Sequence, residues 1–337
     1  MKVLLRADAS PVQGTGHVMR CLTLSEELTR RGHQVLLMTN TSEVEWLERV
    51  IQDSHVAAMR VTQHDLPIGE CLAQSPDFVV VDSYEIPAEE ISQLARNVPV
   101  LAIVDGDARG IVATEYLDHN LGSELEKWPD DVSSKILAGS TFALIRDAVL
   151  AQRREKPWVI QGKLPHLVAV MGGSDPTGAI VRVAQAISRL RGKCTATVVV
   201  SEKWHEQVQE LFDDQQDIEI ISPTVELPRI LASADIAISA SGTSAWELCS
   251  LGIPSILIAV VENQSQSLQR MIEHNLVLGI DVTRGGTIDV TTEVETMVGS
   301  LIENDGLREQ LSQECAKYFD GSGKARVVNV LEEIRKK

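Results

Sequence analysis

The sequence predicts an α/β protein made of two doubly wound, Rossmann-like domains, each built on a parallel sheet. The chain has 337 residues, of which 44% are hydrophobic. At roughly 100–200 residues per domain, this length suits two buried cores. In both halves, short apolar runs are followed by glycine-rich turns and then by segments of helical period. That order is typical of parallel strands with helices on both faces of the sheet.

The first half contains four apolar runs that we expect to be strands. They are Lys2 to Arg6, Gln34 to Thr39, Phe78 to Asp82 and Val100 to Asp105. Helix-period segments lie between them, and the clearest runs from Gly16 to Arg31.

The second half contains five such runs. They are Leu167 to Met171, Thr195 to Val200, Ile218 to Ile221, Ile236 to Ser239 and Ser255 to Ala259. Helical patterns follow Gly178, Glu226, Thr243 and Asn263.

Residues 151–165 (AQRREKPWVIQGKLP) separate the halves. They interrupt the periodicity with two prolines and clustered charge, as an exposed connection does. We therefore expect a first domain at 1–150, a linker at 151–165, a second domain at 166–320 and a C-terminal helix in 321–337, amphipathic from Lys324.

Charge and cysteine content narrow the possible functions. The 31 Lys and Arg residues against 48 Asp and Glu residues give a net charge of −17, which repels phosphate backbones and anionic lipid. No apolar window approaches the roughly 20 residues of a spanning helix. The five cysteines include no C-x-x-C pair. We therefore expect a cytoplasmic protein without nucleic acid, membrane insertion, disulfides or structural zinc.

The first glycine turn, Gly14-Thr15-Gly16-His17-Val18-Met19-Arg20, follows the first expected strand. A dinucleotide site needs a third glycine where Met19 stands and an acid after the second strand, which instead ends Met38-Thr39-Asn40. An NAD site is therefore not expected. Gly14 and Gly16 let a ligand approach the backbone. His17 is a candidate general base, because the positive end of a helix disfavours a protonated imidazole; a histidine that only caps the turn is the alternative.

Two turns of the second half could also bind a ligand. Gly172 and Gly173 allow backbone amides to face an anion or a sugar, although a tight crossover needs such glycines as well. This turn lacks the Gly-Lys-Ser/Thr ending of a P-loop. The amides of Asn263 and Gln264 suit sugar hydroxyls and acetamido groups, and they also suit a helix cap.

The segment from Ser239 to Glu247 (SASGTSAWE) is the most informative. Ser241, Gly242, Thr243 and Ser244 place hydroxyls and free N–H groups at a helix start, which is a ready diphosphate site. Glu247 lies one turn after Thr243, where its carboxylate could accept two hydrogen bonds from a ribose diol. Ser244 and Glu247 also have the spacing of a capping box, which is the alternative.

Two motifs look like metal or phosphate sites but do not fit. Asp105-Gly106-Asp107 has the D-x-D spelling of some glycosyltransferase metal sites, but it lies in the half opposite the expected diphosphate helix. Gly321-Ser322-Gly323-Lys324 resembles part of a P-loop, but Tyr318 replaces the leading glycine and no strand precedes it. We expect no metal and no cofactor, and a turn before the last helix.

The motifs together resemble the UDP-2,4-diacetamido-2,4,6-trideoxy-β-L-altropyranose hydrolases of pseudaminic acid synthesis. They are similar also to the related spore-coat polysaccharide proteins. They occur in the family's order from residue 3 to about residue 325. Besides the turns above, they include Arg6-Ala7-Asp8-Ala9-Ser10, Val81-Asp82-Ser83-Tyr84 and Gly139-Ser140-Thr141-Phe142-Ala143-Leu144-Ile145-Arg146.

The resemblance implies a glycosyltransferase-B-type (GT-B) fold, two facing Rossmann-like domains with the active site in the cleft. It also implies that water attacks the anomeric carbon of a UDP-sugar and releases UDP and the free sugar with inversion. His17 matches the family's proposed base. Arg20, in the first glycine turn, and Tyr84, in a matching motif, are candidate substrate-binding residues. The matching binding residues are Gly242, Thr243 and Glu247 on the nucleotide helix, and Asn263 and Gln264 near the sugar diphosphate.

Three departures from the family pattern concern the sugar pocket. Phe142 replaces Tyr, Glu262 replaces Asp, and Val104-Asp105-Gly106-Asp107 replaces a run of adjacent acids. The sequence therefore predicts the fold and the nucleotide half of the site more closely than the sugar.

The predicted function is hydrolysis of a UDP-sugar to UDP and a free amino or acetamido deoxy sugar. A UDP-sugar-dependent transferase and a noncatalytic nucleotide-sugar binding protein are the alternatives, because all three share the fold and the donor site. The expected partner is the small UDP-sugar alone. The oligomeric state stays open, with a monomer as the working expectation.

Overall fold

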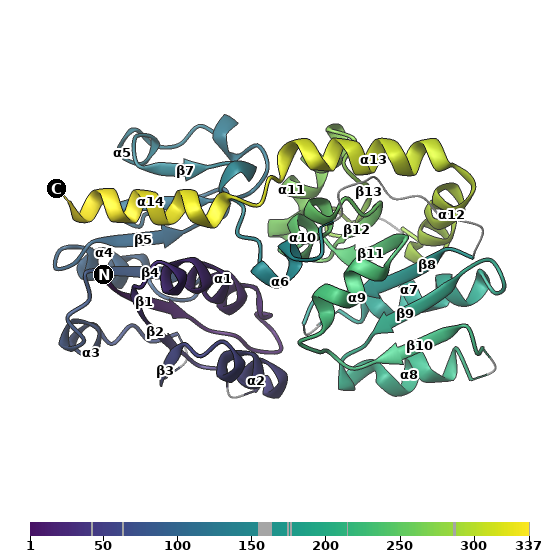
Figure 1. Ribbon diagram of the computed structural model, residues 1–337, viewed down its shortest axis with the longest axis horizontal. Helices are drawn as coiled ribbons and strands as arrows, with labels where there is room; N and C mark the ends of the chain where they lie inside the picture. Colours follow the sequence, from purple (N-terminus) through teal and green to yellow (C-terminus); the bar gives the residue numbers. More distant parts are fainter. Residues whose placement is uncertain are drawn as a thin grey trace. The chain divides into compact units, whose positions relative to one another are not determined.

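A computed structural model describes residues 1–41, 43–62, 64–153, 164–173, 175, 177–213, 215–285 and 288–336 (Figure 1). The chain divides into two compact units. The first comprises Met1–Ile145 together with Gly321–Lys337, and the second comprises Arg146–Asp320. Each unit is built on one parallel sheet, as the sequence predicts.

The sheet of the first unit has the strand order β3-β2-β1-β4-β5-β6-β7. Its strands are β1 (Lys2–Ala7), β2 (Gln34–Thr39), β3 (Ala57–Arg60), β4 (Phe78–Asp82), β5 (Val100–Ile103), β6 (Glu115–Asp118) and β7 (Ile136–Ala138). The order reverses between β1 and β4. In open α/β sheets, ligands bind at such a switch point, outside the carboxyl ends of the strands.

Helices cover both faces of this sheet. They are α1 (Gly16–Arg30), α2 (Glu45–Asp53), α3 (Ile68–Ala73), α4 (Ala88–Ala95), α5 (Asp130–Ser133) and α14 (Gly323–Arg335), with 3₁₀ turns at Ser123–Leu125 and Ser140–Phe142. Successive β1 residues point to opposite faces: Val3 and Leu5 belong to one hydrophobic core, and Leu4 belongs to the other. Because both faces are buried, the strands read as continuous apolar runs.

Helix α1 begins directly after the first glycine turn. Val18, Leu22 and Leu28 lie on its buried side and pack into the core beneath β1, as their helical spacing predicts. The helix ends at Arg30, and Gly32, two residues later, has a φ of 77° in the left-handed region. There the N–H of His33 donates to the carbonyl of Leu28 at 3.0 Å, so the end of the helix is closed by a glycine turn.

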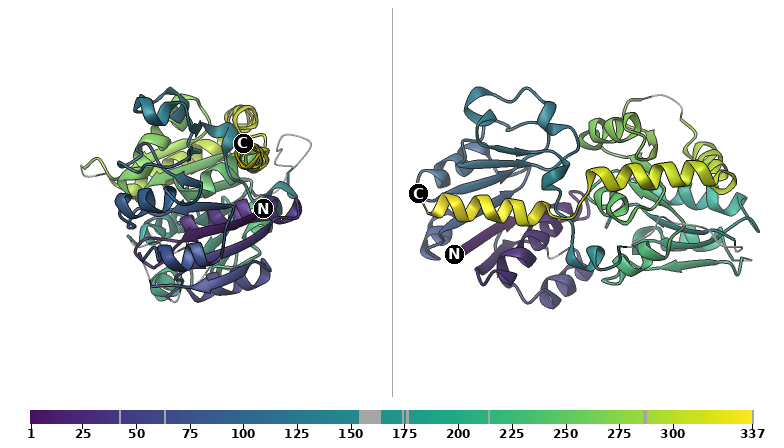
Figure 2. Two further views of the ribbon diagram at one scale, coloured as in Figure 1. Left: turned by 90° about the vertical axis from the view of Figure 1, so that its left-hand side faces the viewer. Right: turned by 45° about the horizontal axis from the view of Figure 1, so that its top comes forward.

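The last helix, α14, completes the first unit. Val327, Val328 and Leu331 are fully buried in the same core as α1, and Figure 2 shows α14, in yellow, along the first unit in its right-hand view. A Cβ at Gly323 would overlap the carbonyl of Ala143. Lys324 is buried and paired with Glu26. Of the P-loop-like segment, Gly321 and Ser322 precede α14, whereas Gly323 and Lys324 are its first residues, so only half of the segment forms the expected turn.

The sheet of the second unit has the order β10-β9-β8-β11-β12-β13. Its strands are β8 (His166–Val170), β9 (Thr195–Val199), β10 (Ile218–Ile221), β11 (Ile236–Ala240), β12 (Ser255–Ala259) and β13 (Leu278–Asp281). The order reverses between β8 and β11, so this unit repeats the arrangement of the first.

The helices of the second unit include the three expected at ligand-binding turns. They are α6 (Asp147–Leu150), α7 (Ala179–Arg189), α8 (His205–Glu210), α9 (Leu227–Ser233), α10 (Ser244–Leu251), α11 (Glu262–Glu273), α12 (Val290–Glu303) and α13 (Asp305–Tyr318), with a 3₁₀ turn at Glu202–Trp204. The main core joins strand residues such as Ile238 and Ile256 to Val183 of α7 and Val294 of α12.

Nine expected strands are present, with ends shifted by at most two residues. The run from Val100 ends as a strand at Ile103 rather than Asp105, because the chain turns away at Gly106, which has a φ of 75°. The short strands β3, β6, β7 and β13 were not expected. Three of them are edge strands, whose partly exposed sides weaken the apolar pattern.

Other expectations from composition can also be compared with the structure. All five cysteines are free and buried. Of the expected linker, 154–163 lies outside the described residues. In the described ranges, no helix combines the length and the apolar character needed to cross a bilayer.

Candidate functional site

The first cluster of candidate residues lies at the switch point of the first unit. His17 is on the first turn of α1, which follows β1, and Asp82 is the last residue of β4. β1 and β4 are hydrogen-bonded neighbours, with Ala7 opposite Asp82. The strand order therefore brings His17 and Asp82 together at the carboxyl edge of the sheet.

The imidazole of His17 is oriented by Asp82. Nδ1 of His17 lies 2.6 Å from Oδ1 of Asp82, and both side chains are buried. A carboxylate can only accept a hydrogen bond, so the proton must be on Nδ1. In the neutral imidazole, Nε2 then carries a lone pair, and it has no hydrogen-bond partner among the described residues. This arrangement is that of a base held by an orienting carboxylate.

Arg20, one turn after His17, links two buried carboxylates. Its Nε and Nη2 donate to Asp82 at 2.8 and 2.7 Å, and its Nη1 donates to both oxygens of Asp105 at 3.1 and 3.0 Å. Burial alone would raise the pKa of Asp82, but the charge of Arg20 and the hydrogen bonds from His17 and Arg20 outweigh it and keep that pKa below its usual value. Asp82 is therefore an anion, as its role toward His17 requires.

Asp105 collects further donors. Nδ2 of Asn120 donates to it at 2.7 Å, and the hydroxyl of Tyr84 donates to its other oxygen. Burial opposes the charge, but Arg20 and the neighbouring donors keep the pKa of Asp105 below its usual range. Burial and the charge of Asp105 raise the pKa of Tyr84 above its usual value, so Tyr84 remains a neutral donor.

Tyr84 also connects His17 with a second arginine, Arg109. The rings of His17 and Tyr84 meet edge to face at 4.7 Å, and the guanidinium of Arg109 lies 5.2 Å from the centre of the Tyr84 ring. Nη2 of Arg109 donates to the carbonyl of Ser83 at 2.6 Å. Nε of Arg109 is buried and has no acceptor among the described groups.

The second cluster lies at the carboxyl edge of the sheet in the second unit. β8, β11 and β12 are consecutive neighbours there, so the turns after them lie along one edge. Gly172 follows β8 with a φ of 82°, and the Gly173 turn continues from it. Ser241, Gly242, Thr243 and Ser244 follow β11, and Asn263 and Gln264 follow β12.

The start of α10 presents hydrogen-bond donors. The N–H groups of Ala245 and Trp246 donate to the carbonyls of Gly242 and Thr243 at 2.9 and 3.2 Å. Those of Gly242, Thr243 and Ser244 have no acceptor in the part of the chain that is described, and the positive dipole end of the helix favours an anion. Thr243 makes no side-chain cap, so these N–H groups are not taken by its hydroxyl. Oγ of Ser241 is buried and without a hydrogen-bond partner in the part of the chain that is described.

Gln264 points its amide NH₂ group toward this helix start. Its Oε1 accepts the N–H of Val260 at 3.0 Å, which leaves Nε2 as the outward donor. A Cβ at Gly242 would lie 3.6 Å from that Nε2. Gly242 and Gln264 are thus adjacent, whereas Asn263 is exposed on the first turn of α11.

Glu247 is held by Arg146. Nε of Arg146 donates to Oε1 of Glu247 at 2.5 Å, and Nη2 donates to Oε2 at 2.6 Å. The side chains are 18% and 8% exposed. The capping-box alternative needs the carboxylate of Glu247 to turn back to the helix start, but this carboxylate instead accepts from Arg146.

Several residues of these clusters were not predicted as site residues, among them Asp82, Asp105, Arg109, Asn120 and Arg146. Asp82 could have been found as a charged residue that ends a fully apolar run, and Arg146 as the basic end of a quoted motif. Asp105 was interpreted as a decoy metal ligand. In the structure, its oxygens accept from Arg20, Tyr84 and Asn120 instead.

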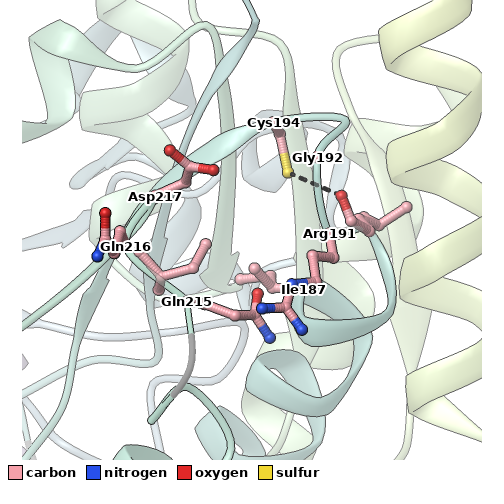
Figure 3. Close-up of a pocket in the computed structure, with 9 residues that line it drawn as sticks. Ile187, Arg191, Gly192, Cys194, Gln215, Gln216 and Asp217 are labelled. Atoms are coloured by element: carbon pink, nitrogen blue, oxygen red, sulfur yellow. Dashed lines mark hydrogen bonds between the residues drawn. The ribbon is translucent and has the colours of Figure 1, made fainter.

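A cavity of about 250 Å³ lies at the other edge of the second sheet (Figure 3). It is lined by the end of α7 and the starts of β9 and β10, among them Arg191, Cys194 and Asp217. Sγ of Cys194 is 3.9 Å from the carbonyl of Leu190, and burial raises the pKa of this thiol to about 11. The cavity therefore contains none of the predicted site residues.

Metal binding has no evident set of ligands. Across the described ranges, no three His, Cys, Asp or Glu side chains are grouped so that they could hold a metal ion.

Known proteins are similar to this chain over both of its units. The chain is 22% identical to the spore coat polysaccharide biosynthesis protein SpsG of Bacillus subtilis over 345 residues, covering 99% of this chain and 98% of that protein. It is similar to the crystal structure of MurG from Acinetobacter baumannii, with a TM-score of 0.64, 16% identity and coverage of 98% and 99%. It is similar also to the UDP-GlcNAc 2-epimerase of Neisseria meningitidis bound to UDP-GlcNAc, with a TM-score of 0.70, 14% identity and coverage of 99% and 100%.

The second unit also matches a described domain. Residues 167–285 match the glycosyltransferase family 28 C-terminal domain, a range that contains β8 to β13 and the start of α10. The expected GT-B-like fold, with two α/β domains that each contain a parallel sheet, is therefore confirmed. Residues 167–285 of the second unit are thus similar to a glycosyltransferase domain, and the chain is similar to SpsG over nearly its full length.

Proposed function

We propose that this protein hydrolyses a UDP-sugar, with His17 as the general base. The observation that carries the proposal is the pairing of Nδ1 of His17 with Asp82, which leaves Nε2 able to take a proton. An activated nucleophile needs such a base with an orienting partner.

In the proposed reaction, the oxygen of a water molecule attacks the anomeric carbon of the sugar while its proton passes to Nε2 of His17. The bond between that carbon and the diphosphate oxygen breaks, and UDP leaves with the electron pair. Attack from the face opposite the leaving group inverts the anomeric configuration. Nothing needs to be oxidised or reduced, so no redox cofactor is required.

The second unit is proposed to bind the nucleotide. Its match to a glycosyltransferase domain supports this. The N–H groups of residues 242–244, which have no acceptor among the described residues, and the nearby side chains of Ser241 and Gln264 support it as well. The helix dipole and these donors would stabilise negative charge that grows on the diphosphate as the bond breaks. The UDP-GlcNAc bound to the similar epimerase supports a UDP-sugar as the ligand.

Transfer of the sugar to an acceptor hydroxyl is the second candidate. The similarity of residues 167–285 to a glycosyltransferase domain favours it, and the same base could take the proton of an alcohol. Both reactions use His17 and both release UDP.

The test is incubation with a panel of UDP-sugars, without any acceptor, in water labelled with heavy oxygen. Hydrolysis gives UDP and a free sugar that carries the label at the anomeric carbon, observable by NMR and mass spectrometry. UDP release that requires an added alcohol would instead establish the transferase. UDP binding without release in either case would leave only a binding function.

The Glu247→Ala variant tests separately whether the nucleotide binds at α10. The matched control is Glu273→Ala, which changes a glutamate at the exposed end of α11. Loss of hydrogen bonds to a charged group should weaken UDP binding by about 1–3 kcal/mol in calorimetry. Equal UDP affinity in the folded Glu247→Ala variant would contradict the assignment.

A further inference from the structure

The carboxylate of Glu247 has fewer open acceptor positions than its sequence context indicates. A carboxylate offers about four lone-pair positions, two on each oxygen. Arg146 occupies both oxygens at once, through Nε and Nη2 at 2.5 and 2.6 Å. This is the two-pronged geometry in which two parallel N–H groups face the two oxygens.

The positions that remain open point away from each other. In a parallel arrangement of this kind, the fork takes the two lone pairs that share one side of the carboxylate. The other two diverge, one from each oxygen. Neighbouring ribose hydroxyls lie side by side, so they cannot reach both divergent positions while the fork is in place.

We infer that Arg146 is a positioning residue that restricts Glu247 to accepting a single ribose hydroxyl of the bound nucleotide. The inference rests on the proposed function, in which the second unit binds UDP. It refines the prediction that Glu247 holds both hydroxyls.

The burial of this pair supports a fixed orientation. The side chain of Glu247 is 8% exposed and that of Arg146 is 18% exposed, so neither is a freely moving surface group. Arg146 stands directly before α6 and Glu247 lies within α10. A guanidinium fork fixes the plane of the carboxylate, which a lysine, with a single ammonium, does not.

A purely structural role must be distinguished from this one. If Arg146 only joined α6 to α10, its replacement would lower stability and weaken all nucleotides alike. Only a positioning role makes UDP affinity depend more on one ribose hydroxyl than on the other. The readout is therefore the difference in affinity between nucleotides that lack one hydroxyl or the other.

The experiment is calorimetric titration of the full-length protein with UDP, 2′-deoxy-UDP and 3′-deoxy-UDP. The wild type should bind one deoxy analogue about tenfold or more weakly than UDP, since one hydrogen bond to a charged group is lost. It should bind the other within about threefold of UDP, since that hydroxyl has no open acceptor on Glu247.

Two variants and one control accompany the titration. Arg146→Lys keeps the charge but not the fork, so the difference between the two analogues should fall below about threefold. Glu247→Gln should also reduce the difference in affinity between the two analogues. Arg153→Lys is the matched control, because Arg153 donates to the carbonyl of Ser250 at the other end of α10; it should keep the wild-type difference.

The outcomes separate the inference from the proposed function. A folded wild type that binds no UDP overturns the proposed function and the inference with it. UDP binding with an equal loss for both analogues, or an Arg146→Lys variant that keeps the wild-type difference, overturns the inference alone.

Discussion

Nδ1 of His17 lies 2.6 Å from Oδ1 of Asp82, although the two residues are 65 positions apart in the chain. Nη2 of Arg20 lies 2.9 Å from the same Nδ1 and 2.7 Å from Asp82. Since Nδ1 must donate to the carboxylate, the proton of Arg20 goes to Asp82 as well. Asp82 is therefore shared by an imidazole that it orients and a guanidinium that keeps it charged.

Replacement of His17 tests the base directly. His17→Ala should lower kcat by on the order of 10²–10⁴, because general-base assistance is felt in the transition state. UDP affinity should stay nearly unchanged, because the nucleotide is proposed to bind the second unit. Steady-state kinetics and calorimetry measure the two effects.

His17→Asn separates a base from a turn-stabilising residue. Asparagine can form hydrogen bonds but does not accept a proton at neutral pH. We expect it to be nearly as slow as alanine. Activity within a few fold of the wild type would refute the base and leave His17 as a residue that stabilises the turn.

Asp82→Asn should also slow the reaction. An amide can donate to Nδ1, which favours the tautomer with its proton on Nε2, and this tautomer cannot act as the base. We expect kcat to fall by on the order of 10²–10⁴ with little change in UDP affinity.

The matched control for Asp82 is Asp77→Asn, just before the other end of β4, where Asp77 accepts the N–H of Lys2 at 2.7 Å. Circular dichroism must confirm that both variants fold, because Asp82→Asn leaves the buried Arg20 with one carboxylate fewer. Equal activity of the two variants would show that Asp82 does not orient the base.

Turnover should persist in excess chelator. Asp105, the first acid of the D-x-D motif, accepts from Arg20, Tyr84 and Asn120, and a metal would have to displace these donors. Activity assays with and without EDTA measure the effect. Complete loss of activity that a divalent metal restores would indicate that Asp105 and Asp107 are metal ligands.

His119 should make stability depend on pH. It is 1% exposed, and burial, together with the charge of Arg20, lowers its pKa from 6.5 to about 4. The unfolded chain therefore binds a proton between these values that the folded chain does not. The contribution is fully present above pH 6.5 and is lost as the pH falls toward 4, by up to about 3 kcal/mol.

Urea unfolding of the wild type and His119→Gln between these pH values measures this effect. The glutamine at position 119 cannot titrate, so the free energy of unfolding of the variant should vary less with pH. All other titrating groups are common to both proteins, and the difference between the two curves isolates His119. Parallel curves would contradict the prediction.

The sequence was sufficient for the parts of the fold that are decided locally. The buried strands β1, β2 and β4 carry continuous apolar runs, and α1 has a helical period between two glycine turns. The edge strand β3 has only exposed or half-buried side chains. Its pairing with β2 depends on the neighbouring strand rather than on its own pattern, so it escaped prediction.

A sequence motif can single out a candidate residue only where the motif contains that residue. His17 and Glu247 stand in glycine- or serine-rich helix starts, and this position makes them candidates. Their partners do not, because Asp82 and Arg146 lie 65 and 101 positions away. Which carboxylate or guanidinium meets them depends on strand order and helix packing, which no local pattern encodes.

The return of the chain to the first unit affects the order in which the protein can fold during synthesis. Val327, Val328 and Leu331 fill the core beneath β1 and α1, but they are made only after the whole second unit. The second unit, Arg146–Asp320, is one uninterrupted stretch and can close while the ribosome is still working. The N-terminal sheet must wait with an open hydrophobic face until α14 emerges. The unit that is synthesised first is therefore completed only when α14 has been translated.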